Sequence, residues 1–155
     1  MVDLKTFGVQ PGAGRHYEEI IYSLALLYNV ISNEVAAYLK SCNLTIGKMN
    51  ILMAIKHQGG REGIRQVDIS KHLIVTPSNM TKMLDKLEKD NLVSRHNLTD
   101  DRRVNLITIT DKGSQLLDKV WPGYDAIIQN LLKDIPLKNQ ERLAALLTRW
   151  LGQMQ

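Results

Sequence analysis

The sequence is poor in residues that staple a fold covalently or carry it across a membrane. One cysteine among 155 residues, Cys42, allows no internal disulfide, and with four scattered histidines it provides no cysteine-rich zinc framework. Uninterrupted apolar runs such as 51–55 fall far short of the ~18 residues of a membrane span, and the N-terminus has no apolar signal-peptide core. We therefore expect a cytoplasmic protein with no membrane contact.

Catalytic motifs are also missing. The chain has no Gly-x-x-x-x-Gly-Lys phosphate loop, no Gly-x-Ser-x-Gly elbow and no His-Glu-x-x-His pair. The histidines lie on different predicted elements without the i, i+4 spacing of metal ligands; they are His16, His57, His72 and His96. We expect no enzymatic activity, no metal and no cofactor.

The overall composition indicates an ordinary globular protein of one structural domain. Hydrophobic residues make up 44% of the chain and charged residues 23%, which is enough apolar material for a packed core. An excess of 20 Lys and Arg over 16 Asp and Glu gives a net charge of +4. This excess is compatible with an anionic partner but does not identify one, so the distribution of the charges must decide.

Hydrophobic periodicity predicts a mainly helical chain with one small β-hairpin. A breaker-rich segment over residues 1–14 predicts a loosely ordered arm. The expected elements are helices over 17–40, 45–58, 66–73, 77–90 and 111–133, a last helix after Pro136, and strands over 92–96 and 104–109. Thr45 is expected to cap the second helix, and Pro122-Gly123 to kink the long one.

The order of the central elements is that of a winged helix-turn-helix, in which the second helix of the pair enters the major groove of DNA. We assign residues 45–110 to this DNA-binding region, and residues 15–44 and 111–155 to a helical region. The outer helices carry apolar stripes wider than one small winged domain could cover, so we expect them to form a dimer.

The helix that begins at Thr76-Pro77 combines a good N-cap with proline at the first helical position. Its first turns expose small polar residues that suit a helix N-terminus placed against phosphates and base edges, namely Ser78, Asn79, Thr81 and Lys82. Asn79 can pair bidentately with adenine and is the expected base reader. Taken alone, such a segment is more often an ordinary exposed polar helix start.

Charged residues also mark the tip of the predicted hairpin, over residues 97–103. Asp101 can hold the guanidinium of Arg103 in a fixed orientation, which suits the narrow minor groove of A·T-rich DNA, whereas Arg102 suits a phosphate. Lys71, Lys86 and Arg95 are further candidates for contact with the DNA backbone.

Three linked segments resemble the multiple antibiotic resistance regulator (MarR) family of transcription factors. Residues 76–82 resemble the start of that family's recognition helix, residues 87–93 its exit into the first wing strand, and residues 101–113 its wing and the turn into the next helix. Asn91 stands where the family often has glycine, and asparagine tolerates the same left-handed backbone.

The resemblance implies a homodimeric repressor that binds a pseudo-palindromic double-stranded DNA operator through two winged modules. A small-molecule effector lodged near the dimer helices would change the separation of the two recognition helices and release the DNA. Tyr28, Met53 and Tyr124 are the residues we expect at such a pocket.

Three other interpretations stay open. A winged module can dock a protein, although such a surface would expose apolar residues. A nonspecific architectural DNA binder is a second alternative, for which +4 is a small net charge. Cys42 could act as a redox sensor, although a lone cysteine is more often an apolar filler.

Overall fold

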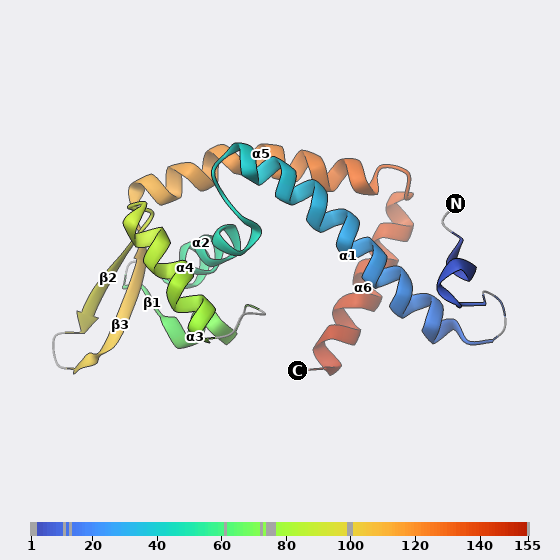
Figure 1. Cartoon of the computed structure of the whole chain (residues 1–155), viewed down its shortest axis with the longest axis horizontal. Helices are drawn as coiled ribbons and strands as arrows, with labels where there is room; N and C mark the ends of the chain where they lie inside the picture. Colours follow the sequence, from blue (N-terminus) through green and yellow to red (C-terminus); the bar gives the residue numbers. More distant parts are fainter. Residues whose placement is uncertain are drawn as a thin grey trace. The chain divides into compact units, whose positions relative to one another are not determined.

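The structure is a computed structural model that describes residues 3–10, 12, 14–60, 62–71, 73, 77–98 and 101–154, with the backbone alone at 77, 78, 97, 98 and 101–105. The elements in chain order are η1 (Leu4–Phe7), α1 (His16–Ser41), α2 (Ile46–Gln58), β1 (Ile64–Arg65), α3 (Gln66–Lys71), α4 (Pro77–Lys89), β2 (Val93–Leu98), β3 (Asp101–Ile109), α5 (Asp111–Leu132) and α6 (Leu137–Gln153), as Figure 1 shows. This confirms the expected fold class, mainly helical with a small antiparallel sheet.

The chain divides into two compact units. Residues 35–124 form the winged unit, and residues 1–34 together with 125–155 form the helical unit. From the sequence, the expected DNA-binding region begins at residue 45 and ends at residue 110. The boundaries of the compact units lie instead inside the long helices α1 and α5. Each of these helices therefore contributes to both units.

The core of the winged unit is built by α2, α3, α4 and the sheet. The Thr45 hydroxyl accepts a hydrogen bond from the Lys48 amide (3.2 Å), which confirms the expected N-cap of α2. Apolar side chains of these helices and of strand β3 are fully buried together, among them Ile51, Leu52, Ile69, Met80, Leu84, Leu87 and Ile107. This shared apolar packing holds α4 on the body of the unit.

The sheet contains one strand that the sequence did not reveal. Its order is β1-β3-β2, with Ile64 opposite Ile107 and Val93 opposite Ile109. Gly63 precedes β1 with φ +92°, and a Cβ there would lie 2.9 Å from the Ile107 carbonyl oxygen, so glycine is required for this approach. Two residues are too few to show an alternating pattern, which is why β1 was missed.

The hairpin loop is shorter than expected. Residues 97 and 98 belong to β2, and β3 begins at Asp101, so the expectation of a loop over 97–103 was wrong at both ends. The register shifts between Asn97 and Leu98, where the pairing passes from Asn105 to Asp101. An irregularity of this kind locally disrupts the ladder and bends the strand.

The helical unit has almost no core of its own. Val9 is its one buried side chain within the part of the chain that the structure describes. In the described part of the segment before α1, Asp3 caps η1 and the Gly12 amide donates to Glu19. The α6 helix has no buried residue, and much of its apolar surface faces outward.

Candidate nucleic-acid interface

The α4 helix has one buried and one exposed face. Met80 and Leu84 are fully buried and Met83 is partly buried, as the helical period predicts. Asn79, Thr81, Lys82 and Lys86, four of the expected contact residues, are all exposed. Of the other two, Thr76 lies outside the described residues, and Ser78 is described only by its backbone.

The exposed face differs in charge along its length. Lys82 and Lys86 form no ion pair within the described part of the chain, so their ammonium groups are available to an anionic partner. Thr81 is engaged, because its hydroxyl accepts a hydrogen bond from the Gln66 side-chain amide (2.8 Å). This bond ties the start of α3 to α4, and no local pattern in the sequence pointed to Gln66.

Arg95 on β2 contacts α4 instead of solvent. Its guanidinium donates to the Asp85 carboxylate (Nη2–Oδ1 2.6 Å) and to the Glu88 carboxylate (Nη1–Oε2 2.9 Å). Its side chain is 24% exposed, less than either carboxylate. The guanidinium of Arg95, which was expected to bind a phosphate, is therefore engaged in a fork of two hydrogen bonds between β2 and α4.

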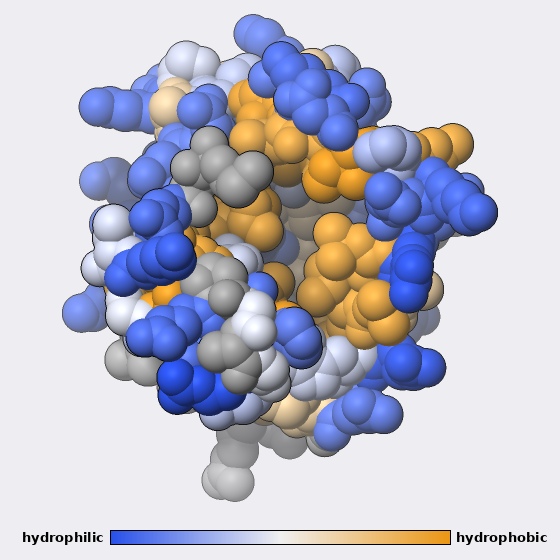
Figure 2. All heavy atoms as spheres, turned by 90° about the vertical axis from the view of Figure 1, so that its right-hand side faces the viewer, coloured by the Kyte–Doolittle hydropathy of each residue, from blue (hydrophilic) through white to orange (hydrophobic). Residues whose placement is uncertain are grey.

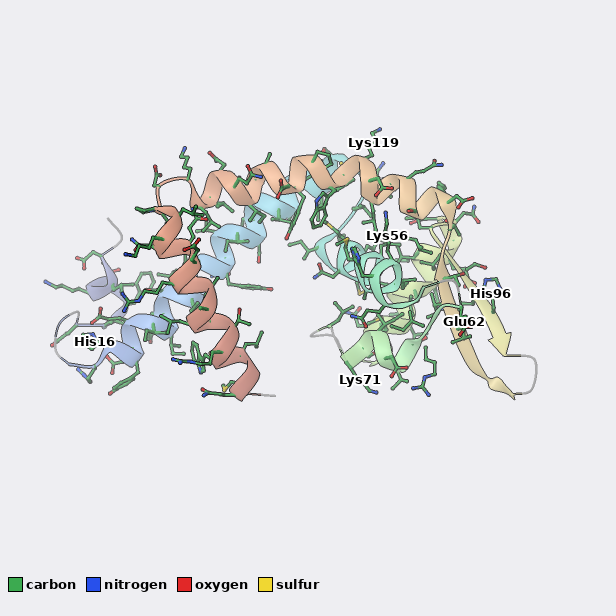
Figure 3. All side chains as sticks on the ribbon, turned by 180° about the vertical axis from the view of Figure 1, so that it is seen from behind. His16, Lys56, Glu62, Lys71, His96 and Lys119 are labelled. Carbon is green, nitrogen blue, oxygen red and sulfur yellow. The ribbon has the colours of Figure 1, made fainter. Side chains whose placement is uncertain are left out.

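Lys71, the other expected phosphate contact outside α4, is also paired. Its ammonium donates to Asp68 (2.9 Å), which accepts a second bond from Arg65 (2.6 Å). These two donors, with Lys71 the stronger, lower the pKa of the Asp68 carboxyl below its usual value. Figure 3 shows Lys71 at the edge of the winged unit. Its side chain is exposed, and the Asp68 carboxylate partly neutralises its positive charge.

The wing is the antiparallel pair β2 and β3. Asp101, Arg102 and Arg103 begin β3 and so lie at the far end of the hairpin from α4 and α5, in a strand instead of the expected loop. Lower on the hairpin, His96 bonds to the Thr108 hydroxyl across the strands (3.1 Å). The side chains of residues 101–103 are not among those described.

A polar turn connects α4 to the wing. Asn91 has φ +57°, the left-handed conformation expected for the residue that replaces glycine. The Leu92 amide donates to the Leu87 carbonyl, and the Thr110 hydroxyl donates to the Asn91 carbonyl (2.8 Å). The exit of α4 is therefore bonded to the segment that starts α5.

Asp90, beside this turn, is a charged connection between helices. Its carboxylate accepts from the Lys48 ammonium of α2 (2.7 Å), and its backbone carbonyl accepts from Lys112 of α5 (2.8 Å). The hydrogen bond from Lys48 is the main cause that lowers the pKa of the Asp90 carboxyl. The end of α4 is thus held to both α2 and α5.

Known proteins match this arrangement. The model of the MarR family matches residues 44–104. The Bacillus subtilis transcriptional repressor MdtR is 32% identical over 114 residues, covering 74% of this chain and 72% of MdtR. The chain belongs to the MarR family.

Solved structures of transcriptional regulators share the fold. The regulator BldR of Sulfolobus solfataricus is 28% identical with a TM-score of 0.77, over 89% of this chain and 96% of BldR. A mutant MarR of E. coli complexed with operator DNA is 24% identical with a TM-score of 0.76, over 87% and 97% of the two chains. The winged-helix architecture of this MarR-family chain is therefore found in both proteins.

One expected pocket residue of this MarR-family chain lines a cavity of the winged unit. The cavity measures about 330 Å³ and lies between α2 and α5, lined by Met53, Lys56, His57, Leu117, Asp118 and Trp121. Lys56 extends from α2 toward α5 and pairs with Asp118 (2.5 Å), as Figure 3 illustrates for Lys56. Tyr124 does not line the cavity but contacts Trp121 (ring centroids 5.3 Å), and Tyr28 is 71% exposed in the helical unit.

Cys42 lies next to a packed tyrosine. Its side chain is partly buried, with the sulfur 3.7 Å from the Ser41 hydroxyl. The Tyr38 hydroxyl donates to the Val120 carbonyl (2.9 Å), and burial, followed by the influence of Cys42, raises the pKa of Tyr38. Within the described residues no group of three or more His, Cys, Asp and Glu side chains could hold a metal ion.

Proposed function

We propose that this MarR-family chain is a sequence-specific double-stranded DNA-binding repressor. The observation that carries the proposal is the exposed polar face of α4, where Asn79, Lys82 and Lys86 lie on a helix whose opposite face packs on the core. A rigidly packed helix with such a face can enter the major groove without exposing apolar side chains to phosphates. The relative MdtR is itself named a transcriptional repressor.

The roles of the contact residues follow from their chemistry. Asn79 reads a base edge, since its amide can donate and accept at adenine. Thr76, Ser78 and Thr81 position the helix start against the DNA backbone, and the ammonium groups of Lys82 and Lys86 bind phosphates. In the wing, Asp101 orients Arg103 in the minor groove and Arg102 binds a phosphate.

We further propose that two copies assemble through the helical unit. Its apolar side chains are exposed along α1 and α6, and the face in Figure 2 shows them gathered into patches among hydrophilic residues. By length and composition alone, α1 could also cross a membrane, the one such helix among the described residues. In a regulator of this family, cover by a second copy accounts for the same exposure and gives two recognition helices for a pseudo-palindrome.

The cavity between α2 and α5 is the proposed effector site. Its apolar wall includes Met53 and Trp121, and the Lys56–Asp118 pair supplies polar groups that can orient a small molecule. A ligand there would act on α5, which passes into the helical unit. Release of DNA would follow if the liganded dimer no longer places both recognition helices one DNA turn apart.

The experiment that tests the proposal is a selection of bound sequences from a random duplex pool, run with the wild-type protein and with Arg103→Ala. We expect the wild type to enrich an inverted repeat with half-sites about 10 base pairs apart. We expect Arg103→Ala to bind more weakly and to lose A·T preference beside the half-sites. Binding without any enriched sequence would indicate an architectural DNA binder, and no binding at all would favour a protein-docking module.

A further inference from the structure

The contacts of Arg95 point to a role that differs from direct phosphate binding. Asp85 and Glu88 are three residues apart on α4, so their carboxylates lie on the same side of the helix. Arg95 comes from the first wing strand and reaches both carboxylates with two different guanidinium nitrogens, at 2.6 and 2.9 Å. A planar guanidinium can satisfy two carboxylates in this way, whereas an ammonium is a single point charge.

Burial favours a fixed fork. The Arg95 side chain is 24% exposed, whereas Asp85 is 54% and Glu88 40% exposed. The covered partner is therefore the cation, and it is held between the strand and the helix. To bind a phosphate, Arg95 would have to leave two carboxylates unpaired close to the DNA backbone, and the repulsion would offset the new contact.

The fork joins the two parts of the winged unit that are proposed to enter DNA. The α4 helix carries the proposed major-groove residues, and β2 continues into the proposed minor-groove tip. A rigid link between them fixes how far apart the two contacts lie. It also neutralises part of the negative charge that Asp85 and Glu88 place beside Lys86.

We propose that Arg95 is a positioning residue that locks the wing to the recognition helix and screens Asp85 and Glu88 from the DNA phosphates. The inference rests on the proposed DNA-binding function. It assigns Arg95 no contact with DNA. Asp85 and Glu88 have the complementary role of holding Arg95, and this role needs no contact between them and DNA.

The test is a double-mutant cycle on the duplex that the wild-type protein selects from the random pool. Affinities are measured at one fixed salt concentration for the wild type, Arg95→Gln, Asp85→Asn/Glu88→Gln and the triple variant. We expect Arg95→Gln to bind about tenfold more weakly, the change that one charge-assisted hydrogen bond commonly carries. Neutralising the carboxylates should restore only the smaller part of this loss, the part that comes from their unscreened charge, and should bring no gain when Arg95 is present, because the fork is then lost.

Two further variants separate the fork from its charge. Arg95→Lys keeps the cation but loses the fork, so we expect it to bind nearly as weakly as Arg95→Gln. Lys119→Gln is the matched control for loss of one positive charge in the winged unit. Lys119 lies on α5, and its side chain is exposed and points outward in Figure 3. It forms no ion pair with the described residues, so we expect Lys119→Gln to change the affinity for DNA only slightly.

The contrary results are distinct. Wild-type binding by Arg95→Lys, or an equal gain from carboxylate neutralisation in both backgrounds, would show that Arg95 binds phosphate directly and would overturn the inference alone. Failure of the wild type to select DNA would overturn the proposed function instead. Slowly exchanging guanidinium protons of Arg95 in the nuclear magnetic resonance spectrum of the free protein would still show the fork, and fast exchange would exclude it.

Discussion

At the scale of single residues, Asn79 is the side chain on which base recognition is expected to depend most. It is exposed near the start of α4, next to the fully buried Met80 that fixes the helix on the core. Replacement by alanine should relax specificity at one base-pair position by about 1–3 kcal/mol. The measurement is the affinity for a set of duplexes that each differ from the selected operator at one base pair.

Lys82→Gln is the control for Asn79→Ala because it removes a charge from the same face. A phosphate contact has no base preference, so Lys82→Gln should weaken binding to every duplex alike and reduce the salt slope by about one. If Asn79→Ala also weakened all duplexes equally, Asn79 would contact the DNA backbone and not a base.

Asp90 provides a prediction about pH. Its carboxyl has a lowered pKa in the folded protein because Lys48 donates a hydrogen bond to it, so the unfolded chain binds more protons there and stability rises with pH. The contribution is present above the unfolded pKa of about 3.9 and is lost as pH falls through the lower folded value. Asp90→Asn should reduce the free energy of unfolding at pH 7 by up to about 1 kcal/mol, since the Asp90 side chain is 49% exposed and solvent screens the pair.

Urea unfolding at pH 7 and near pH 2.5 measures this effect at one protomer concentration. The difference between wild type and Asp90→Asn should shrink at the lower pH. Asp134→Asn serves as the control, because Asp134 is exposed in the turn before α6 and its side chain pairs with none of the described residues. A difference that persisted unchanged at low pH would mean that the Asp90 charge does not stabilise the fold.

At the scale of elements, helix boundaries could be predicted where local chemistry decides them. Thr45, Pro77 and Asn91 mark a cap, a helix start and a left-handed turn, and the structure has all three at those places. Each depends on the conformational preference of one residue and its near neighbours. Such features can be predicted from sequence without knowledge of the tertiary fold.

The contacts of the candidate site were harder to predict from the sequence. The Gln66–Thr81 bond spans 15 residues, and the Arg95 fork joins a strand to the preceding helix across a turn. Arg95 was identified from the sequence only as a cation, because its carboxylate partners depend on how the strand packs on the helix. The partner of Lys71 is Asp68, three residues earlier on the same helix, so spacing alone was a usable signal for that pair. The i, i+3 spacing of Asp85 and Glu88 was a usable signal, since two carboxylates on one helix face favour a cation between them.

The packing of α5 on the end of α1 provides an element-scale prediction in which two effects oppose each other. Alanine normally favours a helix over glycine by about 1 kcal/mol, so Gly123→Ala alone should stabilise α5. A Cβ at Gly123, however, would clash with the Tyr38 hydroxyl, which donates to the Val120 carbonyl. We expect the clash to win and Gly123→Ala to lower the free energy of unfolding by roughly 1 kcal/mol net, since overpacking costs about 1–3 kcal/mol.

The partner variant is Tyr38→Phe, which removes the hydroxyl, the nearest clashing atom, but keeps the ring carbons Cζ and Cε2 that also crowd the added Cβ. Gly123→Ala should cost less in the Tyr38→Phe background than in the wild type, and urea unfolding of the four proteins measures this coupling. If Gly123→Ala proved more stable than the wild type, α5 would be able to shift away from Tyr38 without loss of packing.

At the scale of the whole molecule, the distribution of buried residues separates the two units by what stabilises each. The winged unit buries residues from all its helices and its sheet, whereas in the described part of the helical unit only Val9 is buried. Apolar burial provides the main stabilisation of a fold, at about 25 cal/mol per Å². In a single copy the apolar surface of the helical unit therefore stays exposed to water, and a second copy would bury it.

Leu146 tests whether that surface joins two copies. It is 48% exposed on α6, and glutamate there would place a charge in the proposed interface. We expect Leu146→Glu to shift the protein toward the monomer in sedimentation equilibrium. Val67→Glu, at a similarly exposed apolar position on α3 of the winged unit, should leave the association unchanged.

The same variant links assembly to DNA binding. A dimer binds the second half-site as an intramolecular event, so a monomer should bind the inverted repeat at least about 100-fold more weakly. Its affinity for a duplex with one half-site should stay close to that of the wild type, because α4 and the wing are folded within the winged unit. A monomeric Leu146→Glu that still bound the full repeat with wild-type affinity would show that each winged unit binds independently and that dimer geometry cannot control release.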